Sequence, residues 1–219
     1  MKNYLLKILL MLVMCAVCSN AQDSFAATNS KINLAPCLVS GVDKPARCGK
    51  LSVFENRKTK KGRRIDLNVV VFPAQGENPA RDPVFGIAGG PGQGAAQLVA
   101  PVFFRELAPV NRERDIVLVD QRGTGNSNPL NCPINSLKEA INYIGGDYPV
   151  ENWKACRLEL EKKADLRFYT TSIAMDDLDE VRESLGYEKI NLFGVSYGTR
   201  AALAYLRQHP ASVRSVILR

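Results

Sequence analysis

Three residues near the end of the chain have the types and the spacing that nucleophilic catalysis by serine needs. Gly194, Ser196 and Gly198 form the pattern G-x-S-x-G, which holds a serine on a sharp turn between a strand and a helix. The pattern alone is common, but an apolar, strand-like segment, Lys189–Phe193, precedes it, and a helix is expected from Thr199 to about residue 208. The alternative is a serine that only caps this helix. The setting favours a nucleophile elbow with Ser196 at its tip and the two elbow glycines removing side chains that would collide.

A serine that attacks a carbonyl also needs amide donors for the negative oxygen that develops. The backbone N–H of Tyr197, the residue after the serine, is one expected donor. The run Gly89-Gly90-Pro91-Gly92 follows an expected strand, and Gly90 or Gly89 is expected to supply the second donor.

The same glycine run has a competing interpretation as a dinucleotide site. Gly90 to Ala95 fits G-x-G-x-x-A, and Asp120 ends a later strand, as a ribose-binding acid would. Pro91 removes an amide from the loop, however, and the preceding strand is the third in order rather than the first. We therefore expect no cofactor.

The elements that must position these residues alternate along the chain. Two strands, Lys50–Phe54 and Arg64–Phe72, are expected to form a hairpin after a polar leader. Further strands are expected at 82–88, 115–120, 189–193 and 212–218, with helices at the start of 95–107, limited by Pro101, and at 153–163, 173–185 and 199–208. This order predicts an α/β fold: a mostly parallel sheet with an N-terminal antiparallel hairpin and helices on both faces.

Composition excludes several classes of protein. The 219 residues are 46% apolar and 23% charged, as in a globular domain, with a formal net charge of +7. Much of the basic excess lies in the run Arg57–Arg64, which could bind nucleic acid or anionic lipid. No aromatic residues interleave the basic ones, so a solvated turn is favoured and we expect no nucleic-acid partner.

The N-terminus has the pattern of a signal peptide spanning residues 1–26. A short basic start precedes an apolar stretch, and cleavage after Ala21 or Ala26 fits the rule of small residues. The apolar stretch is shorter than a typical membrane-spanning helix. We therefore expect export to the periplasm or the extracellular space, without stable membrane insertion after cleavage.

Four cysteines remain in the expected mature chain, which suggests disulfides in an exported protein. They are Cys37, Cys48, Cys132 and Cys156. Of the three possible pairings, the local one is preferred: Cys37 with Cys48 and Cys132 with Cys156. Because the chain has no C-x-x-C and a single histidine, no metal site is expected.

With these motifs in view, the chain resembles the α/β-hydrolase serine peptidases of the prolyl aminopeptidase and secreted tripeptidyl aminopeptidase group. The matching stretches are Gly89-Gly90-Pro91-Gly92, Asp120-Gln121-Arg122-Gly123-Thr124-Gly125-Asn126-Ser127 and Gly194-Val195-Ser196-Tyr197-Gly198-Thr199-Arg200. The resemblance runs from about Cys37 to the last residue. It implies that Ser196 is the nucleophile, that Tyr197 and Gly90 or Gly89 form the oxyanion hole, and that Asp120 and Arg122 pin a structural loop. Relatives commonly carry histidine where this chain has Ala88, which puts the geometry of the glycine loop in question.

The rest of a catalytic triad is not evident after Ser196. In this fold the acid and the histidine follow the serine, yet the one histidine, His209, lies along the same expected helix, roughly 20 Å away at about 1.5 Å per residue. Residues 27–219 are therefore expected to be the N-terminal part of an α/β-hydrolase domain, without its last strands and cap, and inactive alone. The function expected of the whole is release of N-terminal residues or short peptides through an acyl-enzyme on Ser196. A carboxylesterase and a non-catalytic truncated hydrolase remain alternatives, and the substrate would be a peptide or a small ester.

Overall fold

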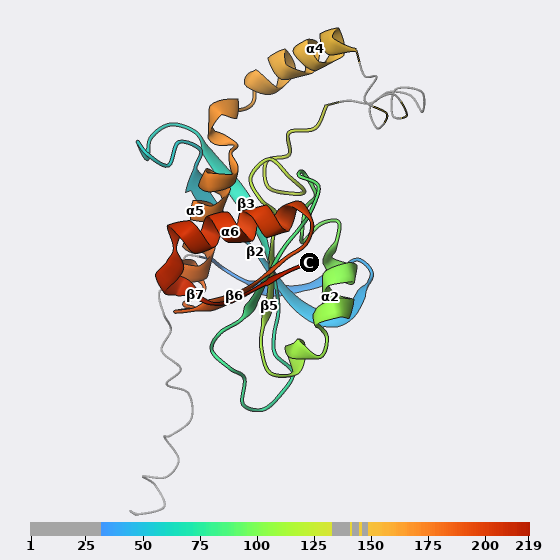
Figure 1. The fold of residues 1–219 in the computed structure, drawn as a ribbon, viewed down its shortest axis with the longest axis vertical. Coiled ribbons are helices and arrows are strands. Elements are labelled where there is room, and N and C mark those ends of the chain that lie inside the picture. Colours follow the sequence, from blue (N-terminus) through green and yellow to red (C-terminus); the bar gives the residue numbers. More distant parts are fainter. Residues whose placement is uncertain (1–31, 133–140, 142–144, 146–148) are drawn as a thin grey trace, which may run out of the picture.

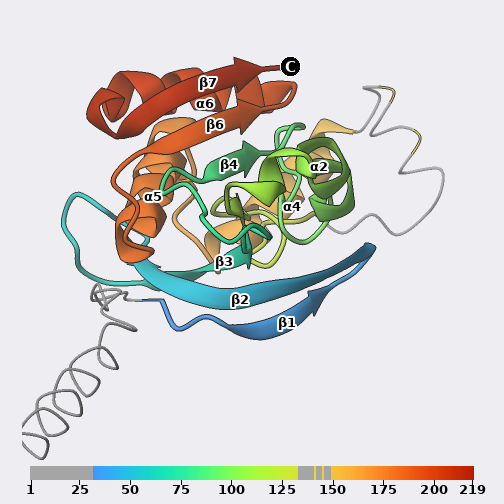
Figure 2. The ribbon, with the colours of Figure 1, turned by 90° about the horizontal axis from the view of Figure 1, so that it is seen from below.

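A single mixed sheet organises the chain. The structure is a computed structural model that describes residues 32–132, 141, 145 and 149–219, so the expected signal peptide lies outside the described residues. Seven strands form the sheet, in the order β1-β2-β3-β5-β4-β6-β7 (Figures 1 and 2). The strands β5, β4, β6 and β7 are mutually parallel, whereas β1, β2 and β3 add to the sheet in antiparallel fashion. The expected fold class is confirmed.

The antiparallel part is larger than the sequence predicts. β3 spans Arg64–Phe72, as expected, but β2 spans Val42–Phe54 and is preceded by β1, Ala35–Val39. The expectation of a polar leader before Lys50 is therefore wrong. In this leader only Val42 and Ala46 are buried along β2, because one face of the strand is exposed, so the sparse apolar residues gave no strand pattern.

The parallel strands are short and buried. They are β4 (Val84–Ile87), β5 (Ile116–Val119), β6 (Ile190–Gly194) and the more exposed edge strand β7 (Val213–Leu218). Alternating side chains of the sheet enter two hydrophobic cores, one on each face. Helices α5 (Thr171–Ser184) and α6 (Tyr197–Gln208) cover one core, and α2 (Ala100–Leu107) covers the other (Figure 2).

The helix α2 corrects a second expectation. The sequence suggested a helix that begins near Ala95 and is limited by Pro101. Instead residues 95–99 form turns, and Pro101 lies in the first turn of a helix that starts at Ala100. Proline is tolerated there because its missing N–H would have no intrahelical acceptor in any case.

The helix α4 (Val150–Glu161) stands apart from the rest (Figure 1). Its one buried residue, Cys156, forms a disulfide with Cys132, while Cys37 is joined to Cys48 across β1 and β2. This is the local pairing that the spacings favour. Short 3₁₀ turns complete the described fold: η2 (Val110–Arg112), η3 (Leu166–Phe168) and η4 (Pro210–Ser212). Among the described residues, no helix is long and apolar enough to cross a membrane.

Candidate active site

The turn between β6 and α6 holds Ser196 in a strained conformation. Ser196 has φ 54° and ψ −120°, a backbone region that residues with side chains rarely adopt, and it is exposed to solvent. A Cβ on Gly198 would collide with the carbonyl oxygen of Ile87 in β4, and one on Gly194 would collide with the carbonyl oxygen of Gly198. The two elbow glycines are therefore required by the close packing of this turn.

Backbone hydrogen bonds fix the turn in the sheet. The Val195 N–H donates to the Ile87 carbonyl at 3.1 Å, and the Ser196 N–H donates to the Arg219 carbonyl at 2.8 Å. The carbonyl of Ser196 accepts from both the backbone N–H and the hydroxyl of Thr199, at 3.0 and 2.7 Å. Because the backbone on both sides is held in this way, the serine side chain projects from a rigid base.

The glycine loop after β4 lies directly against this serine. A Cβ built on Gly89 would be 3.1 Å from the Cβ of Ser196, so any side chain at position 89 would crowd the nucleophile position. Gly90 follows with φ +102°, a conformation favoured by glycine, and precedes Pro91 through a cis peptide bond. Ala88, which precedes the two glycines, is buried in the core that α2 covers.

Two segments that carry backbone amides therefore lie next to Ser196. Tyr197 is the first residue of α6, and the first amides of a helix have no acceptor within the helix. The loop at Gly89 and Gly90 comes from the neighbouring strand β4, which pairs with β6 in parallel register. A carbonyl attacked by Ser196 would develop its negative oxygen between these groups, which is the chemistry of acyl transfer.

Asp120, at the end of β5, has a structural environment. It is 0% exposed, and its carboxylate accepts hydrogen bonds from four groups. The donors are the amides of Ala96 (2.8 Å), Gln97 (3.1 Å) and Asn126 (3.0 Å) and the side chain of Asn68 (2.9 Å). Since its oxygens are occupied and no helix directly follows the glycine loop, the dinucleotide alternative does not fit this structure.

Arg122, two residues further on, is the centre of a buried ion pair. Its guanidinium donates to both oxygens of Asp177 on α5, at 2.6 and 2.8 Å, and to the carbonyls of Glu55 and Phe168, both at 2.9 Å. Burial raises the pKa of Asp177, against the opposing effects of Arg122 and of Arg57, whose guanidinium also contacts this carboxylate at 2.8 Å. The ion pair joins the turn after β5 to α5 and to the β2–β3 hairpin.

Beside the elbow lies a hollow of about 390 Å³. Its wall includes Gly89, Arg122, Tyr169, Thr171 and Tyr197. The hydroxyls of Thr171 and Tyr197 are 2.7 Å apart, which joins the start of α5 to the start of α6. The Tyr169 hydroxyl donates to buried Glu55 at 3.0 Å and accepts from Asn128 at 2.7 Å; burial, followed by the Glu55 hydrogen bond, raises the pKa of Tyr169 to about 12.

His209 is at the opposite end of α6 from Ser196. Ser196 is the residue before the helix and His209 is the residue after it, so the expected separation is reproduced. The His209 ring contacts Asp176 at 3.0 Å and Asp179 at 3.4 Å, both on α5. Burial alone would raise the pKa of Asp179, but hydrogen bonds from Arg182 and Tyr205 hold it below its ordinary value. His209 therefore connects two helices and is not placed to take a proton from Ser196.

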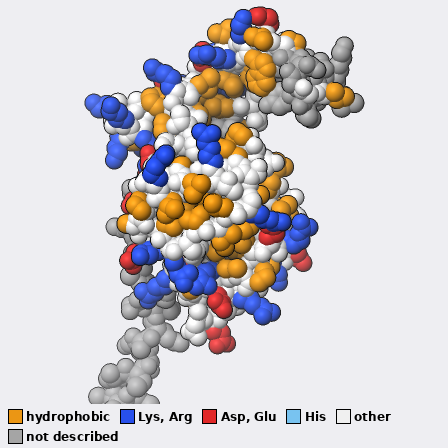
Figure 3. Space-filling view, viewed as in Figure 1, with side chains coloured by type: hydrophobic (Ala, Val, Ile, Leu, Met, Phe, Trp, Pro, Cys, Tyr) orange, Lys and Arg blue, Asp and Glu red, His pale blue; other side chains and the backbone are white. Residues whose placement is uncertain are grey.

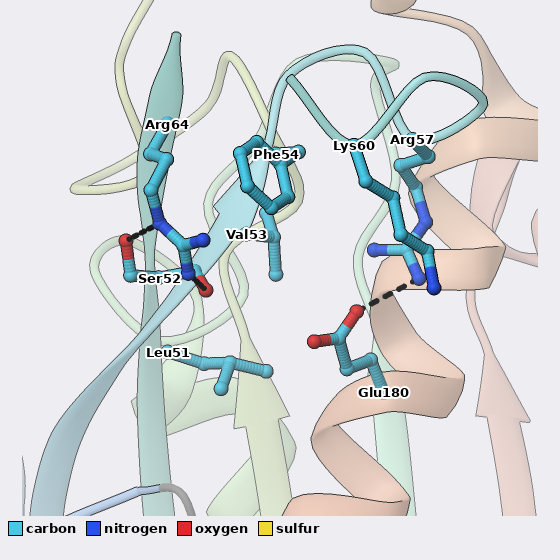
Figure 4. Close-up of a pocket in the computed structure, with 8 residues that line it drawn as sticks. All are labelled: Leu51, Ser52, Val53, Phe54, Arg57, Lys60, Arg64 and Glu180. Carbon is cyan, nitrogen blue, oxygen red and sulfur yellow. Dashed lines mark hydrogen bonds and ion pairs between the residues drawn. The ribbon is translucent and has the colours of Figure 1, made fainter. Parts of the chain in front are cut away.

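A further pocket, of about 410 Å³, lies between β2 and α5 (Figure 4). It shares no lining residue with the elbow or the glycine loop. Arg57 bridges to Glu180 at 2.9 Å, and Arg64 lies over the Phe54 ring at 4.4 Å, so the basic run is less uniformly solvated than expected. Among the described residues, no cluster of three or more acidic, histidine or cysteine side chains could hold a metal.

Comparison with known proteins identifies the protein family of this chain. The α/β hydrolase fold family matches residues 82–219, more than half of the chain, and the chain belongs to this family. It is 29% identical over 193 residues to serine protease Hip1 of Mycobacterium tuberculosis, covering 79% of this chain and 35% of that protein. It is 29% identical over 191 residues to the tripeptidyl aminopeptidase of Streptomyces coelicolor, covering 80% and 35%.

Two proline iminopeptidases are also similar. The protein from Neisseria gonorrhoeae is 28% identical over 149 residues, covering 68% of this chain and 36% of that protein. The crystal structure of the enzyme from Mycobacterium smegmatis superimposes with a TM-score of 0.47 at 19% identity, covering 76% of this chain and 42% of that one. The chain thus spans 35–36% of the length of these curated relatives.

Several residues around the site were not singled out from the sequence. They are Asn68, which bonds Asp120, the half-buried Tyr169, and the buried acids Glu55 and Asp177. Asp177 could have been found, because it lies at helical spacing with the buried residues Ala174, Leu178 and Val181 and so falls on the apolar face of α5. The other three depend on contacts between distant segments, for which the sequence offers no local signal.

Proposed function

We propose that this chain supplies the nucleophile and the oxyanion donors of an exported serine peptidase that removes N-terminal residues or short peptides. Membership of the α/β hydrolase fold family and the relatives named as a serine protease and as aminopeptidases support the class. The observation that carries the proposal is the glycine loop packed against an exposed serine on a strained turn. The two disulfides support the exported location, because such bonds persist in oxidising compartments.

In the proposed reaction the Ser196 hydroxyl oxygen attacks the carbonyl carbon of the peptide bond. The hydroxyl proton passes to a general base, and the carbonyl oxygen becomes negative and accepts hydrogen bonds from the amides of Tyr197 and of Gly90 or Gly89. The C–N bond then breaks, the departing amine takes the proton, and water later hydrolyses the acyl-enzyme. His209 is at the far end of α6, so the proposal assigns the base to no residue described here.

Covalent labelling tests the proposal. The protein that carries this chain is treated with a fluorophosphonate, and the modified residue is located by peptide mass spectrometry. Labelling at Ser196 that disappears in Ser196→Ala is the expected result, while a folded protein whose Ser196 stays unmodified would contradict it. Ser172→Ala, which removes an exposed hydroxyl on α5, is the matched control and should not reduce labelling.

The substrate class is tested separately. A panel of peptides with free or blocked N-termini is compared with short-chain esters at equal concentrations. Cleavage of peptides that requires a free N-terminus supports an aminopeptidase. Turnover of esters alone, with Ser196 still labelled, would replace the aminopeptidase by a carboxylesterase. Non-reducing peptide mapping of the secreted protein checks the disulfides that support export.

A further inference from the structure

A third depression, of about 600 Å³, begins one helical turn from Ser196. We call it the arginine groove, because Arg200 and Arg207 line it along the outward side of α6 and no acidic residue is among its described lining residues. The start of α5 forms its other wall through Thr170 and Thr171. Since Thr170 and Thr171 also line the hollow beside the elbow, the groove and the hollow meet at the start of α5.

The two guanidiniums are available for a ligand. Arg200 and Arg207 are both exposed, and within the described part of the chain neither has a carboxylate partner. Two arginines elsewhere show the contrast: Arg122 is buried against Asp177, and Arg182 bonds Asp179 at 2.6 Å. The groove is therefore a place where positive charge is left without a partner.

The hydroxyl groups of the groove, in contrast, are used by the protein. Thr171 contacts the Tyr197 hydroxyl at 2.7 Å, Ser172 donates to Gln208 at 2.8 Å, and Thr199 donates to the Ser196 carbonyl at 2.7 Å. The first two bonds hold the walls on α5 and α6 together, and the third lies within the start of α6. The guanidinium groups are therefore the polar groups of the groove that remain free to bind a ligand of opposite charge.

The spacing of the arginines suits an extended chain. Arg200, Leu203 and Arg207 share one side of α6, and Leu203 is 50% exposed between them. At a rise of about 1.5 Å per residue, Arg200 lies roughly 6 Å and Arg207 roughly 16 Å along the axis from Ser196. An extended peptide rises about 3.3 Å per residue, so the span to Arg207 corresponds to about five residues.

The surface agrees with this arrangement. Figure 3 shows hydrophobic side chains over α6 with basic side chains along the margin of the patch. A ligand that fits here combines apolar contact with carboxylates, which guanidinium groups bind in a bidentate manner.

We propose that the arginine groove binds acidic peptide segments and so gives the site a preference for substrates that carry Asp or Glu within about five residues of the bond at Ser196. The substrate preference rests on the proposed peptidase function, but the binding of acidic peptides can be measured without catalysis.

The test uses the protein that carries this chain, with Ser196→Ala, and two fluorescent peptides of equal length that differ only in Glu or Gln. Fluorescence anisotropy should show tighter binding of the Glu peptide, by about tenfold, because two exposed guanidinium–carboxylate pairs each contribute modestly. Arg200→Gln and Arg207→Gln should each weaken Glu-peptide binding by about threefold, and the double variant by about tenfold. Binding of the Gln peptide should stay within about twofold, and raising the salt to about 0.5 M should remove most of the difference.

Arg112→Gln is the matched control. Arg112 is exposed in η2, which precedes β5 and so lies at the amino-terminal end of the parallel strands, opposite the elbow. It removes the same charge and should change neither affinity. Equal affinity for the two peptides, or a preference that survives the double variant, would overturn the proposal. Inorganic polyphosphate that binds as tightly through the same arginines would replace a peptide site by a general anion surface.

Failure of this inference can be told from failure of the proposed function. Labelling of Ser196 together with no charge preference in binding would overturn the groove alone. Charge-selective binding together with an unreactive Ser196 would overturn the peptidase mechanism and leave the groove as a binding site.

Discussion

Two turns on either side of β4 carry the polar residues that first suggested chemistry, and they differ in what their side chains do. At the end of β5, Asp120 is fully buried and its carboxylate accepts four hydrogen bonds. At the end of β6, Ser196 is exposed and held at φ 54° by its backbone. Both turns are rich in glycine and both follow short buried strands. The comparison teaches that a buried polar group with all its hydrogen bonds made indicates a structural role. An exposed polar group on strained backbone indicates a reactive site.

The largest expected effect comes from breaking the satisfied turn. Asp120→Ala leaves three backbone amides, that of Ala96 buried, and the Asn68 side chain without their acceptor, and should lower the free energy of unfolding by about 4 kcal/mol. Urea denaturation measures it. Asp66→Ala, an exposed position on β3, should change stability by less than about 0.5 kcal/mol. A loss of less than about 1 kcal/mol in Asp120→Ala would contradict the structural role that these hydrogen bonds indicate.

The next effect tests how tightly the elbow is packed. In Gly198→Ala the new methyl group would occupy the place of the Ile87 carbonyl oxygen, so we expect a loss of about 3 kcal/mol and loss of fluorophosphonate labelling. Gly62→Ala is the control: Gly62 has positive φ, +82°, unlike Gly198, but a Cβ there meets no atom within 4 Å. Its cost should be only about 1 kcal/mol, from backbone strain. Equal losses in the two variants would contradict a packing origin.

Relief of strain at the serine should act in the opposite direction. Ser196→Gly should raise the free energy of unfolding by about 1 kcal/mol, because glycine adopts φ 54° without strain, while abolishing labelling. Ser196→Ala keeps the strain and should abolish labelling without this gain. Thermal denaturation of the two variants side by side isolates the backbone contribution, and no difference between them would argue against stored strain.

The last effect is a pH dependence in the hollow between the two turns. The pKa of Tyr169 is raised to about 12 in the folded protein, chiefly by burial, whereas an unfolded tyrosine titrates near 10. Its contribution to stability is therefore full below about pH 10 and is lost as the pH rises through about 12. In Tyr169→Phe the decline of stability across this alkaline range should be shallower, and the late phenolate absorbance step should be absent. An unchanged slope would show that Tyr169 is not the titrating group.

Much of this architecture could be predicted from local pattern. The strand at Arg64–Phe72, the strand before Ser196 and the helix that Thr170 precedes were all found because their periodicity and capping residues are short-range signals. The errors have physical reasons as well. β1 and the first half of β2 have one exposed face and few apolar residues, and Pro101 begins a helix that it was expected to limit.

The site was predicted unevenly for the same reason. Ser196 and its glycines stand within five consecutive residues, so their spacing is visible in the sequence. The role of Asp120 was open between a ribose ligand and a structural acid until its donors were placed, and one of them, Asn68, lies 52 residues earlier. The arginine groove needs two helices to be packed together, and neither helix alone indicates it.

The sequence by itself determined the order of strands and helices from the second half of β2 onward, the elbow around Ser196 and the spacing that favours the two disulfides. These depend on neighbours along the chain, where side-chain periodicity and turn residues act directly. Only the tertiary structure decided that the glycine loop touches the serine, that Asp120 is satisfied, and that Arg200 and Arg207 face a groove without acids. Those facts depend on the packing of segments far apart in sequence. The buried parallel strands β4, β5 and β6 bring these segments together at their carboxyl ends.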